Sequence, residues 1–394
     1  MTALAPRIRR SIVVALVAGL AVALLLVTGA PAEPDRTTPA AAPVGSYTPV
    51  TGGTFNRPIG TSTDQRRIFT HVNKTIDSTP AGATIRIAVY SFSDKATADR
   101  LLAAKNRGVN VQLVFDDHTI YAQMARLRQA LGKNPNAQSF VVYCYLSCRG
   151  SSGGNMHDKI FMFSKAGSAE NITMVGSNNM TGYNATRQWS DVYTVANDPA
   201  MYFTYAGVFD QLKWDRGMAR TYYQADINGY QAQFYPYANA SQTADPVHQT
   251  LSKIVCTGAA IGTGVGGKTL VRISQHAWNG TRGIYLARKV AALRAQGCVV
   301  QVIYGVGVGT TVRSILTNAK VAMSKGRRPG IRTHQKSLQV SGNFDGNAGA
   351  SMVLTGSHNW SDGAMRRDET ILRIQNAAAY AQYKANFEDI WSNG

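Results

Sequence analysis

The feature that most constrains this chain is an internal duplication. The pattern His-x-Lys occurs at His157 and again at His334, and each copy runs into an apolar stretch. Downstream, aromatic and aliphatic residues recur at helical spacing, and each equivalent pair is 178 positions apart: Tyr202 and Tyr380, Tyr205 and Tyr383, Phe209 and Phe387, Leu212 and Ile390. We expect this stripe to pack in the core and the chain to fold as two similar lobes.

Both halves also contain the pattern of a strand, a helix and a second strand. In the first half these are residues 83–92, 96–107 and 109–117, with Gly108 ending the helix. In the second half they are residues 268–278, 283–296 and 298–305, with Gly297 ending the helix. Such βαβ units pair their strands in parallel, so we predict an α/β fold of two lobes with mixed, largely parallel sheets.

The chain begins with the pattern of a secretory signal peptide over residues 1–32. Three arginines precede a long apolar run, and Ala30-Pro31-Ala32 offers a small-x-small cleavage site. A retained membrane anchor is the alternative, because the run is long for a signal. Residues 33–62 are rich in Pro, Thr, Ala, Ser and Gly, and predict a flexible leader.

The remaining sequence divides into a first lobe over residues 63–235 and a second over residues 245–394. Over roughly residues 217–246 the periodic pattern weakens and Tyr, Gln, Asn and Ala dominate. We therefore place the lobe boundary in this stretch.

The chain carries a net charge of +19, and removal of residues 1–32 leaves +16. A strongly basic, exported protein fits a polyanionic partner such as nucleic acid, anionic lipid headgroups or a charged cell wall. Solubility alone is the plainer explanation, and charge does not choose among these.

The cysteine count is four, an even number that favours disulfides in an exported chain. Three pairings are open. Cys144 with Cys148 would close a small local loop, and Cys256 with Cys298 would then join two segments of the second half. A metal site is disfavoured, because the sequence has no Cys-x-x-Cys and no partnering His cluster.

Polar residues of matching type surround the two His-x-Lys motifs. Residues two apart in a strand point the same way, so His157 and Lys159 share a face, as do His334 and Lys336. A hairpin-like loop, an apolar strand and a Gly-Ser-x-Asn turn follow each motif, and an acidic residue enters the next strand. The turns contain Ser177 with Asn179 and Ser357 with Asn359, and the acidic residues are Asp191 and Asp368-Glu369.

An imidazole, an ammonium, an amide and a hydroxyl together suit a phosphodiester. Lysine offsets its negative charge, Asn and Ser donate to its oxygens, and His acts as nucleophile or acid. A nearby carboxylate would fix the tautomer of each His. A single His-x-Lys usually lies on the surface without a function. The His-x-Lys motif, the Gly-Ser-x-Asn turn and the acidic residue, found twice in the same order, are not expected by chance.

These paired motifs resemble those of the phospholipase D superfamily, from about residue 63 to the end of the chain. The resemblance implies two α/β lobes related by a pseudo-twofold axis, with both motifs in one active site. It implies a phosphohistidine intermediate, no catalytic metal and no cofactor. We also expect a monomer.

Carried over position by position, the resemblance assigns roles to individual residues. His157 is the expected nucleophile and His334 the acid and base, although the order could be reversed. The phosphate-binding residues are then Lys159, Lys336, Asn179 and Asn359; Ser177, Ser357, Asp191 and Glu369 support them.

Two departures from the superfamily signature stand out. Where the signature has Asp after each Lys, this chain has Ser164 and Ser341. The spacing from Lys to Gly-Ser is also longer, at 17 and 20 residues. Because both copies vary alike, we interpret the chain as a divergent branch rather than an inactive one.

Three functions remain open. The first is an exported phospholipase D acting on phospholipid headgroups at a membrane surface. The second is an exported, metal-independent nuclease on the same scaffold, which the basic charge favours. The third is a non-catalytic phosphate-binding module, which the paired His, Lys and Asn residues disfavour.

Overall fold

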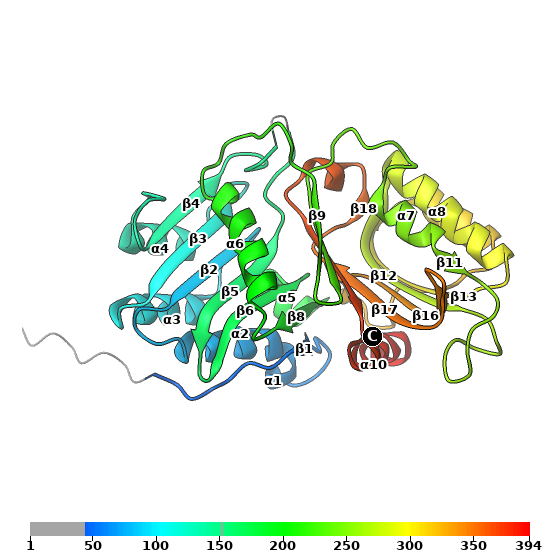
Figure 1. Ribbon diagram of the computed structural model, residues 1–394, viewed down its shortest axis with the longest axis horizontal. Coiled ribbons are helices and arrows are strands. Elements are labelled where there is room, and N and C mark those ends of the chain that lie inside the picture. The colour runs from blue at the N-terminus through cyan, green and yellow to red at the C-terminus, as the bar shows by residue number, and fades with distance from the viewer. Residues whose placement is uncertain (1–43, 151–152) are drawn as a thin grey trace, which may run out of the picture. The chain divides into compact units, whose positions relative to one another are not determined.

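The computed structural model describes residues 44–150 and 153–394 (Figure 1). The predicted signal peptide over residues 1–32 and the first part of the leader lie outside the described residues. Within the described ranges, no helix is both long enough and apolar enough to cross a bilayer.

The first half forms a seven-stranded sheet in the order β1-β8-β6-β5-β2-β3-β4. The βαβ expectation holds at one edge, where β2 pairs in parallel with β3 and β3 with β4. The strands are β1 (Gly52–Phe55), β2 (Thr84–Val89), β3 (Asn110–Asp116), β4 (Phe140–Cys144), β5 (Lys159–Ala166), β6 (Ala169–Gly176) and β8 (Asp191–Val195).

The second half forms a sheet of ten strands that repeats this order. Its path β14-β13-β12-β16-β17-β19 matches β4-β3-β2-β5-β6-β8, and β10 and β9 extend it. The strands are β9 (Tyr223–Ile227), β10 (Tyr230–Phe234), β11 (Ile254–Val255), β12 (Leu270–Asn279), β13 (Val299–Val308), β14 (Ala322–Ser324), β16 (Lys336–Phe344), β17 (Asn347–Gly356), β18 (Trp360–Ser361) and β19 (Thr370–Gln375).

The prediction of two α/β lobes with mixed sheets is confirmed, but the sheets are partly rather than largely parallel. In the first sheet β5 pairs antiparallel with β2 and β6, and β16 pairs antiparallel with β12 and β17 in the second. The short loops after β5 and β16 can join only antiparallel strands, because a parallel pair needs a long crossover.

Helices cover the sheets and bury the predicted aromatic stripe. Tyr205 and Phe209 of α6 and Tyr383 and Phe387 of α10 are buried, which confirms their expected place in the core. The helices are α1 (Ser62–Gln65), α2 (Arg67–Asp77), α3 (Lys95–Asn106), α4 (Ala122–Leu131), α5 (Gly182–Arg187), α6 (Pro199–Leu212), α7 (Pro246–Ser252), α8 (Gly280–Ala295), α9 (Thr310–Asn318), the 3-10 helix Gly363–Arg366 and α10 (Ala377–Asn393).

Helix α3 shows how the local sequence sets an element's ends. The side chain of Asp94 accepts the backbone N–H of Thr97 at 2.9 Å and caps the first turn. The chain leaves the helix at Gly108, whose φ of +90° suits a residue without a Cβ. Gly297, with φ of +100°, has the same place after α8.

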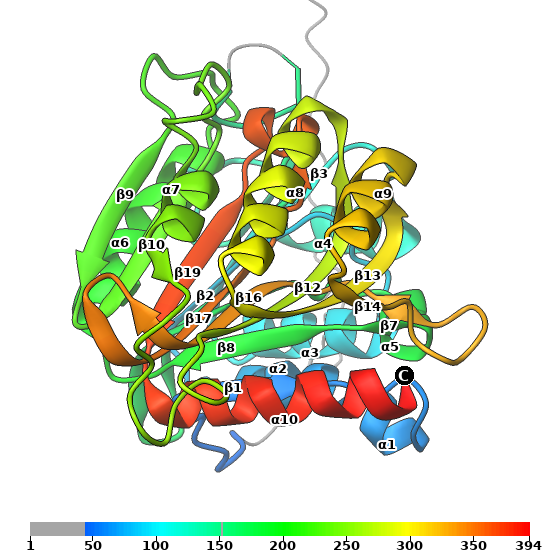
Figure 2. The ribbon, with the colours of Figure 1, turned by 90° about the vertical axis from the view of Figure 1, so that its right-hand side faces the viewer.

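Two predicted boundaries need correction. The leader expected to be flexible over residues 33–62 contains β1, which pairs with β8 through Gly52 and Thr194, and also contains the start of α1. Figure 2 shows β1 beside α10, far away in the sequence. Strands β9 and β10, placed in the first lobe by sequence, join the second sheet through β19. Pairing to a distant edge strand leaves no local periodic signal.

Two disulfides are present among the four cysteines. Cys144 pairs with Cys148 at the end of β4, and Cys256 pairs with Cys298 beside β12 and β13. The sequence had left three pairings open. The structure has the local pair in the first half and the pair with the larger sequence separation in the second.

Candidate active site

Each His-x-Lys motif lies where a central parallel strand ends and its antiparallel neighbour begins. Lys159 opens β5 opposite Val89 of β2, and Lys336 opens β16 opposite Gln275 of β12. In both copies the Lys Nζ donates to the carbonyl of the His two residues earlier, at 2.5 Å. All four side chains are buried, and in the first copy Tyr90 lies beside both His157 and Lys159.

The backbone beside each His pairs with the opposite half of the chain. His157 N donates to Asp368 O at 2.9 Å, and Met156 forms a parallel bridge with Asp368. His334 N donates to Trp189 O at 2.8 Å, where β15 (Arg332–Thr333) pairs in parallel with β7 (Gln188–Trp189). Each histidine therefore lies at a contact between the halves, and the two are close enough for the charge of His334 to lower the pKa of His157.

His157 is oriented by a carboxyl group from the second half. Its Nδ1 lies 2.9 Å from Glu369 Oε2. Burial raises the pKa of Glu369 to about 8. In its ionised form Glu369 accepts Nδ1–H, which leaves the lone pair of Nε2 free to attack an electrophile. This contact matches the role predicted for Glu369.

His334 is oriented by a carbonyl group from the first half instead. Its Nδ1 lies 2.8 Å from the backbone oxygen of Ser177, with the side-chain amide of Asn184 at 3.4 Å. Asp191, the predicted carboxylate partner, is directed elsewhere and accepts hydrogen bonds from Ser177, Thr355 and Tyr383. The expected role of Asp191 is therefore corrected: it supports the Ser177 turn rather than the imidazole.

Burial and mutual repulsion weaken the positive charges of this site. Burial lowers the pKa of Lys159 to about 7 and, with repulsion from Lys159, lowers the pKa of Lys336 well below its usual value. Burial and the nearby lysines lower the pKa of both His157 and His334. An anion bound here would restore these charges, so the electrostatics favour a phosphate-like ligand.

The Gly-Ser-x-Asn turns supply buried polar groups beside the histidines. Ser357 Oγ accepts the N–H of Thr370 at 3.0 Å, as Ser177 Oγ accepts that of Asp191 at 3.1 Å. The side-chain oxygens of Asn179 and Asn359 are buried and have no hydrogen-bond partner in the described part of the chain. An amide oxygen accepts hydrogen bonds, so each side chain would contact a phosphate oxygen only when its amide is turned to present Nδ2–H.

The two serines that replace the signature Asp lie away from the histidines. Ser164 Oγ accepts the N–H of Thr84 at 2.8 Å, and Ser341 Oγ accepts that of Gly264 at 3.1 Å. Each is five residues beyond its Lys, which is about 17 Å along a strand. These hydrogen bonds stabilise the parts of β5 and β16 that are distant from the histidines.

Sequence reasoning missed two aromatic residues that pack against the histidines. Tyr90 lies 4.8 Å from His157 and His276 lies 4.5 Å from His334, measured between ring centroids. Each is the last residue of an equivalent stretch: "RIAVY", which extends one residue beyond β2, and "RISQH", which lies within β12. Aligning these stretches would have identified them.

Arg367 is a further basic residue that the motifs did not indicate. Its charge lowers the pKa of His157 and of both lysines. It directly precedes Asp368 and Glu369, so the segment before β19 that orients His157 also brings a guanidinium to the site.

Within residues 44–150 and 153–394, one group of potential metal ligands lies close together. It consists of Cys144, Cys148 and Asp215, with ligand atoms within 4.8 Å of one another. The two sulfur atoms are joined in a disulfide, which leaves no thiolate for a metal.

The chain belongs to the family described as "Cardiolipin synthase, PLD-like domain", which matches residues 73–213 and 271–391. The two matched segments cover more than half of the chain and contain both His-x-Lys motifs. The phospholipase D resemblance is thereby confirmed. No curated protein sequence compared with the chain matches it significantly.

Two of the following solved structures, the synthase and the kinase, share the fold at low sequence identity. A phosphatidylserine synthase from Haemophilus influenzae Rd KW20 has a TM-score of 0.57 and 12% identity, over 86% of each chain. A polyphosphate kinase from Porphyromonas gingivalis has a TM-score of 0.52 and 11% identity over 86% of this chain, which spans half of the kinase. Nuc, a phospholipase D family member from Salmonella typhimurium, has a TM-score of 0.32 and 23% identity, over 42% of this chain and 96% of Nuc.

Proposed function

We propose that this protein is an exported phosphodiesterase that hydrolyses phospholipid headgroup esters through a phosphohistidine. The observation that carries the proposal is the junction of the two halves, where His157 meets Glu369 and His334 meets Ser177. Family membership supports phosphodiester chemistry in general. The choice of lipid, the export and the monomeric state are parts of the proposal.

The first step forms the covalent intermediate. Nε2 of His157 attacks phosphorus, and the bond from phosphorus to the headgroup oxygen breaks. His334 gives its proton to that oxygen, so the alcohol leaves neutral. Glu369 stabilises the positive charge that phosphorylation places on the ring of His157.

The second step regenerates the site. His334, now neutral, takes a proton from water as the water oxygen attacks phosphorus, and the bond from nitrogen to phosphorus breaks. Lys159 and Lys336 offset the charge of the non-bridging oxygens in both steps. Because an anion raises the pKa of the groups around it, substrate binding itself favours the protonated His334 that the first step needs.

A nuclease on the same site is the second candidate. The net charge of +19 favours it, since binding to a nucleic-acid backbone is largely electrostatic. A non-catalytic phosphate-binding module is the third, and the orientation of both imidazoles disfavours it.

The direct test compares purified protein on phosphatidylcholine vesicles and on plasmid DNA, each without added metal and each with a His157→Ala control. We expect phosphatidic acid from the vesicles and none with the variant. DNA cleavage that the variant loses, without any lipid product, would establish the nuclease instead. No cleavage of either substrate would leave the binding module.

A further inference from the structure

An exposed surface beside the active site combines apolar and basic side chains. The loops after β3 and β4 and the segment after α6 contribute its apolar residues. They are Ile120, Tyr145, Leu146 and Trp214, with 51%, 70%, 42% and 47% of their surface exposed. Large side chains exposed together in this way mark interaction sites more often than isolated ones do.

Hydrogen bonds hold these three segments together as one surface. The N–H of Asp117 donates to Cys144 O at 3.2 Å, the N–H of Tyr145 to Asp215 Oδ2 at 3.1 Å, and the N–H of Met218 to Arg149 O at 2.9 Å. The Cys144–Cys148 disulfide closes the central loop. The three segments that carry these four exposed side chains are therefore in contact with one another, and we refer to the four side chains together as the patch.

The patch is fastened to the segment that orients the nucleophile. The carboxylate of Asp368 accepts the N–H of Cys148 at 2.6 Å, the hydroxyl of Ser147 at 2.9 Å and the N–H of Arg149 at 3.2 Å. The next residue is Glu369, which contacts His157. Whatever binds the patch is thus placed beside the site.

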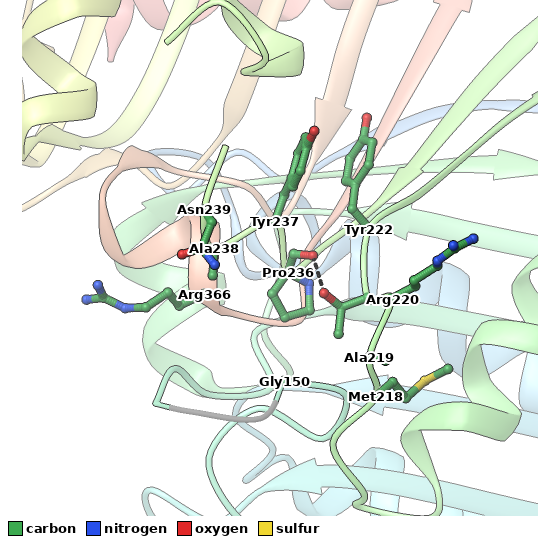
Figure 3. A pocket seen from close by; sticks show the side chains of 11 residues that line it. Gly150, Met218, Ala219, Arg220, Tyr222, Pro236, Tyr237, Ala238, Asn239 and Arg366 are labelled. Atoms are coloured by element: carbon green, nitrogen blue, oxygen red, sulfur yellow. Dashed lines mark hydrogen bonds between the residues drawn. The ribbon is translucent and has the colours of Figure 1, made fainter. Parts of the chain in front are cut away.

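Basic residues follow Trp214 in the sequence and also lie two positions before Asp368. Arg216, Arg220 and Arg366 are exposed, and the last two line a pocket of about 450 Å³. Figure 3 shows Tyr222 and Tyr237 side by side in this pocket, with Arg220 and Arg366 on opposite sides of Pro236. The rings stack with their centroids 4.4 Å apart.

Nearby acidic groups offset only part of this positive charge. Asp215 already accepts the N–H of Tyr145, and Asp210 pairs with Lys213 at 2.9 Å. The three exposed arginines have no carboxylate within ion-pair distance in the described part of the chain. The surface therefore presents a net positive border around an apolar centre.

We propose that this patch docks the protein on an anionic lipid bilayer and so presents headgroups to the adjacent active site. Tyr and Trp favour the boundary between headgroups and acyl chains, and aliphatic side chains insert beneath it while arginines bind lipid phosphates. Ile120 and Leu146 have no aromatic face for stacking on bases, so the composition favours a bilayer over single-stranded nucleic acid. This inference rests on the proposed function for its substrate, but docking is measured separately.

The first experiment measures binding without turnover. The full chain carrying His157→Ala is sedimented with vesicles of dioleoylphosphatidylglycerol, alone and with Tyr145→Ser plus Trp214→Ser added. We expect the patch substitutions to lower the partition constant by about tenfold or more. A matched control, Phe203→Ser plus Ile261→Ser, removes two exposed apolar side chains elsewhere and should change it less than about twofold.

A second variant tests the basic border. Arg216→Glu with Arg220→Glu should weaken binding to phosphatidylglycerol vesicles, with a loss that shrinks at high salt, and should leave binding to phosphatidylcholine vesicles nearly unchanged. Equal losses on both lipids would contradict the assigned role of the arginines.

Two further measurements separate docking from catalysis and from nucleic acid. With His157 intact, the Tyr145 and Trp214 variant should hydrolyse bis(p-nitrophenyl) phosphate within about twofold of wild type, because the patch does not touch the reacting atoms. Unchanged vesicle binding by that variant would overturn the proposal, as would a larger loss for a fluorescent single-stranded oligonucleotide than for vesicles. If the wild type docks through the patch but cleaves no phosphodiester, the proposed function is wrong. The docking proposal would then still hold.

Discussion

The two halves of the active site use the same residue types but give their histidines different partners. His157 meets the carboxyl group of Glu369, whereas His334 meets the carbonyl oxygen of Ser177. A carboxylate stabilises a positively charged ring, and a carbonyl fixes the tautomer without adding a charge. The difference suggests how duplicated halves acquire unlike roles, with His157 as the nucleophile and His334 as the acid and base.

The strand register explains how this difference arises. Gly176 pairs with Val192 in the first half and Gly356 pairs with Ile371 in the second. The position equivalent to Glu369 is therefore Ser190, and Asp191 is equivalent to Thr370. The first half has no carboxylate at the position from which Glu369 orients His157, and the carboxylate of Asp191 binds Thr355 and Tyr383 of the second half.

The largest effect is expected from removing either imidazole. His157→Ala should lower hydrolysis of both phosphatidylcholine and bis(p-nitrophenyl) phosphate by roughly 10⁴-fold or more. His334→Ala should lower the first reaction as much but still release one equivalent of p-nitrophenolate in a burst, because that leaving group needs no proton. Identical bursts from the two variants in stopped-flow assays would contradict the assignment of His157 as nucleophile and His334 as acid and base.

The two lysines should be more alike than the histidines. Each is buried and bound to the carbonyl of its own His, so Lys159→Met and Lys336→Met should each lower kcat/KM by roughly 10²- to 10³-fold. Steady-state kinetics on a soluble phosphodiester measure both. A tenfold or larger difference in kcat/KM between the variants would show that one lysine stabilises the phosphate much more than the other.

The carboxylates should differ clearly. Glu369→Gln should lower kcat by roughly 10²-fold, because an amide stabilises the phosphorylated ring less well. Asp191→Asn should lower kcat less than about tenfold and act chiefly on stability. Circular dichroism melts separate the two effects, and the reverse order would contradict the assigned partners.

The pH dependence of stability offers another test of Glu369. Burial raises its pKa to about 8 in the folded protein, whereas an unfolded Glu ionises near 4.5. Between these values the unfolded chain loses its proton first, so the wild type loses stability as pH rises. Glu369→Gln should therefore gain stability relative to wild type from pH 5 to pH 8, on the order of 3 kcal/mol. A constant difference in the free energy of unfolding would show that this carboxyl is not buried as described.

The disulfides give the smallest expected difference between the halves. Cys256 and Cys298 are separated by 42 positions and Cys144 and Cys148 by 4. Loop entropy predicts that Cys256→Ala with Cys298→Ala lowers the free energy of unfolding by about 4 kcal/mol. The same change in the local pair should lower it by about 2 kcal/mol. Urea unfolding of the two double variants measures both. An equal loss would indicate that the short disulfide also holds the loop around Asp368.

The sequence predicted what each half does alone. Glycine geometry predicts the helix ends at Gly108 and Gly297. Local periodicity predicts the shared face of His157 and Lys159 and the buried stripes of α6 and α10. It did not predict the partners across the junction, such as Asp368 beside His157 or Trp189 beside His334. Those contacts depend on how two finished lobes pack, and no pattern within a lobe encodes them.

The central claim is that imidazoles from both halves act on one phosphorus atom in unlike roles. Mass spectrometry of the His334→Ala protein, quenched during reaction with bis(p-nitrophenyl) phosphate, tests it most directly. The account predicts one phosphoryl adduct per chain, on the peptide that contains His157, and none when His157 is also replaced. An adduct on His334 in the His157→Ala protein, or none in either variant, would contradict it.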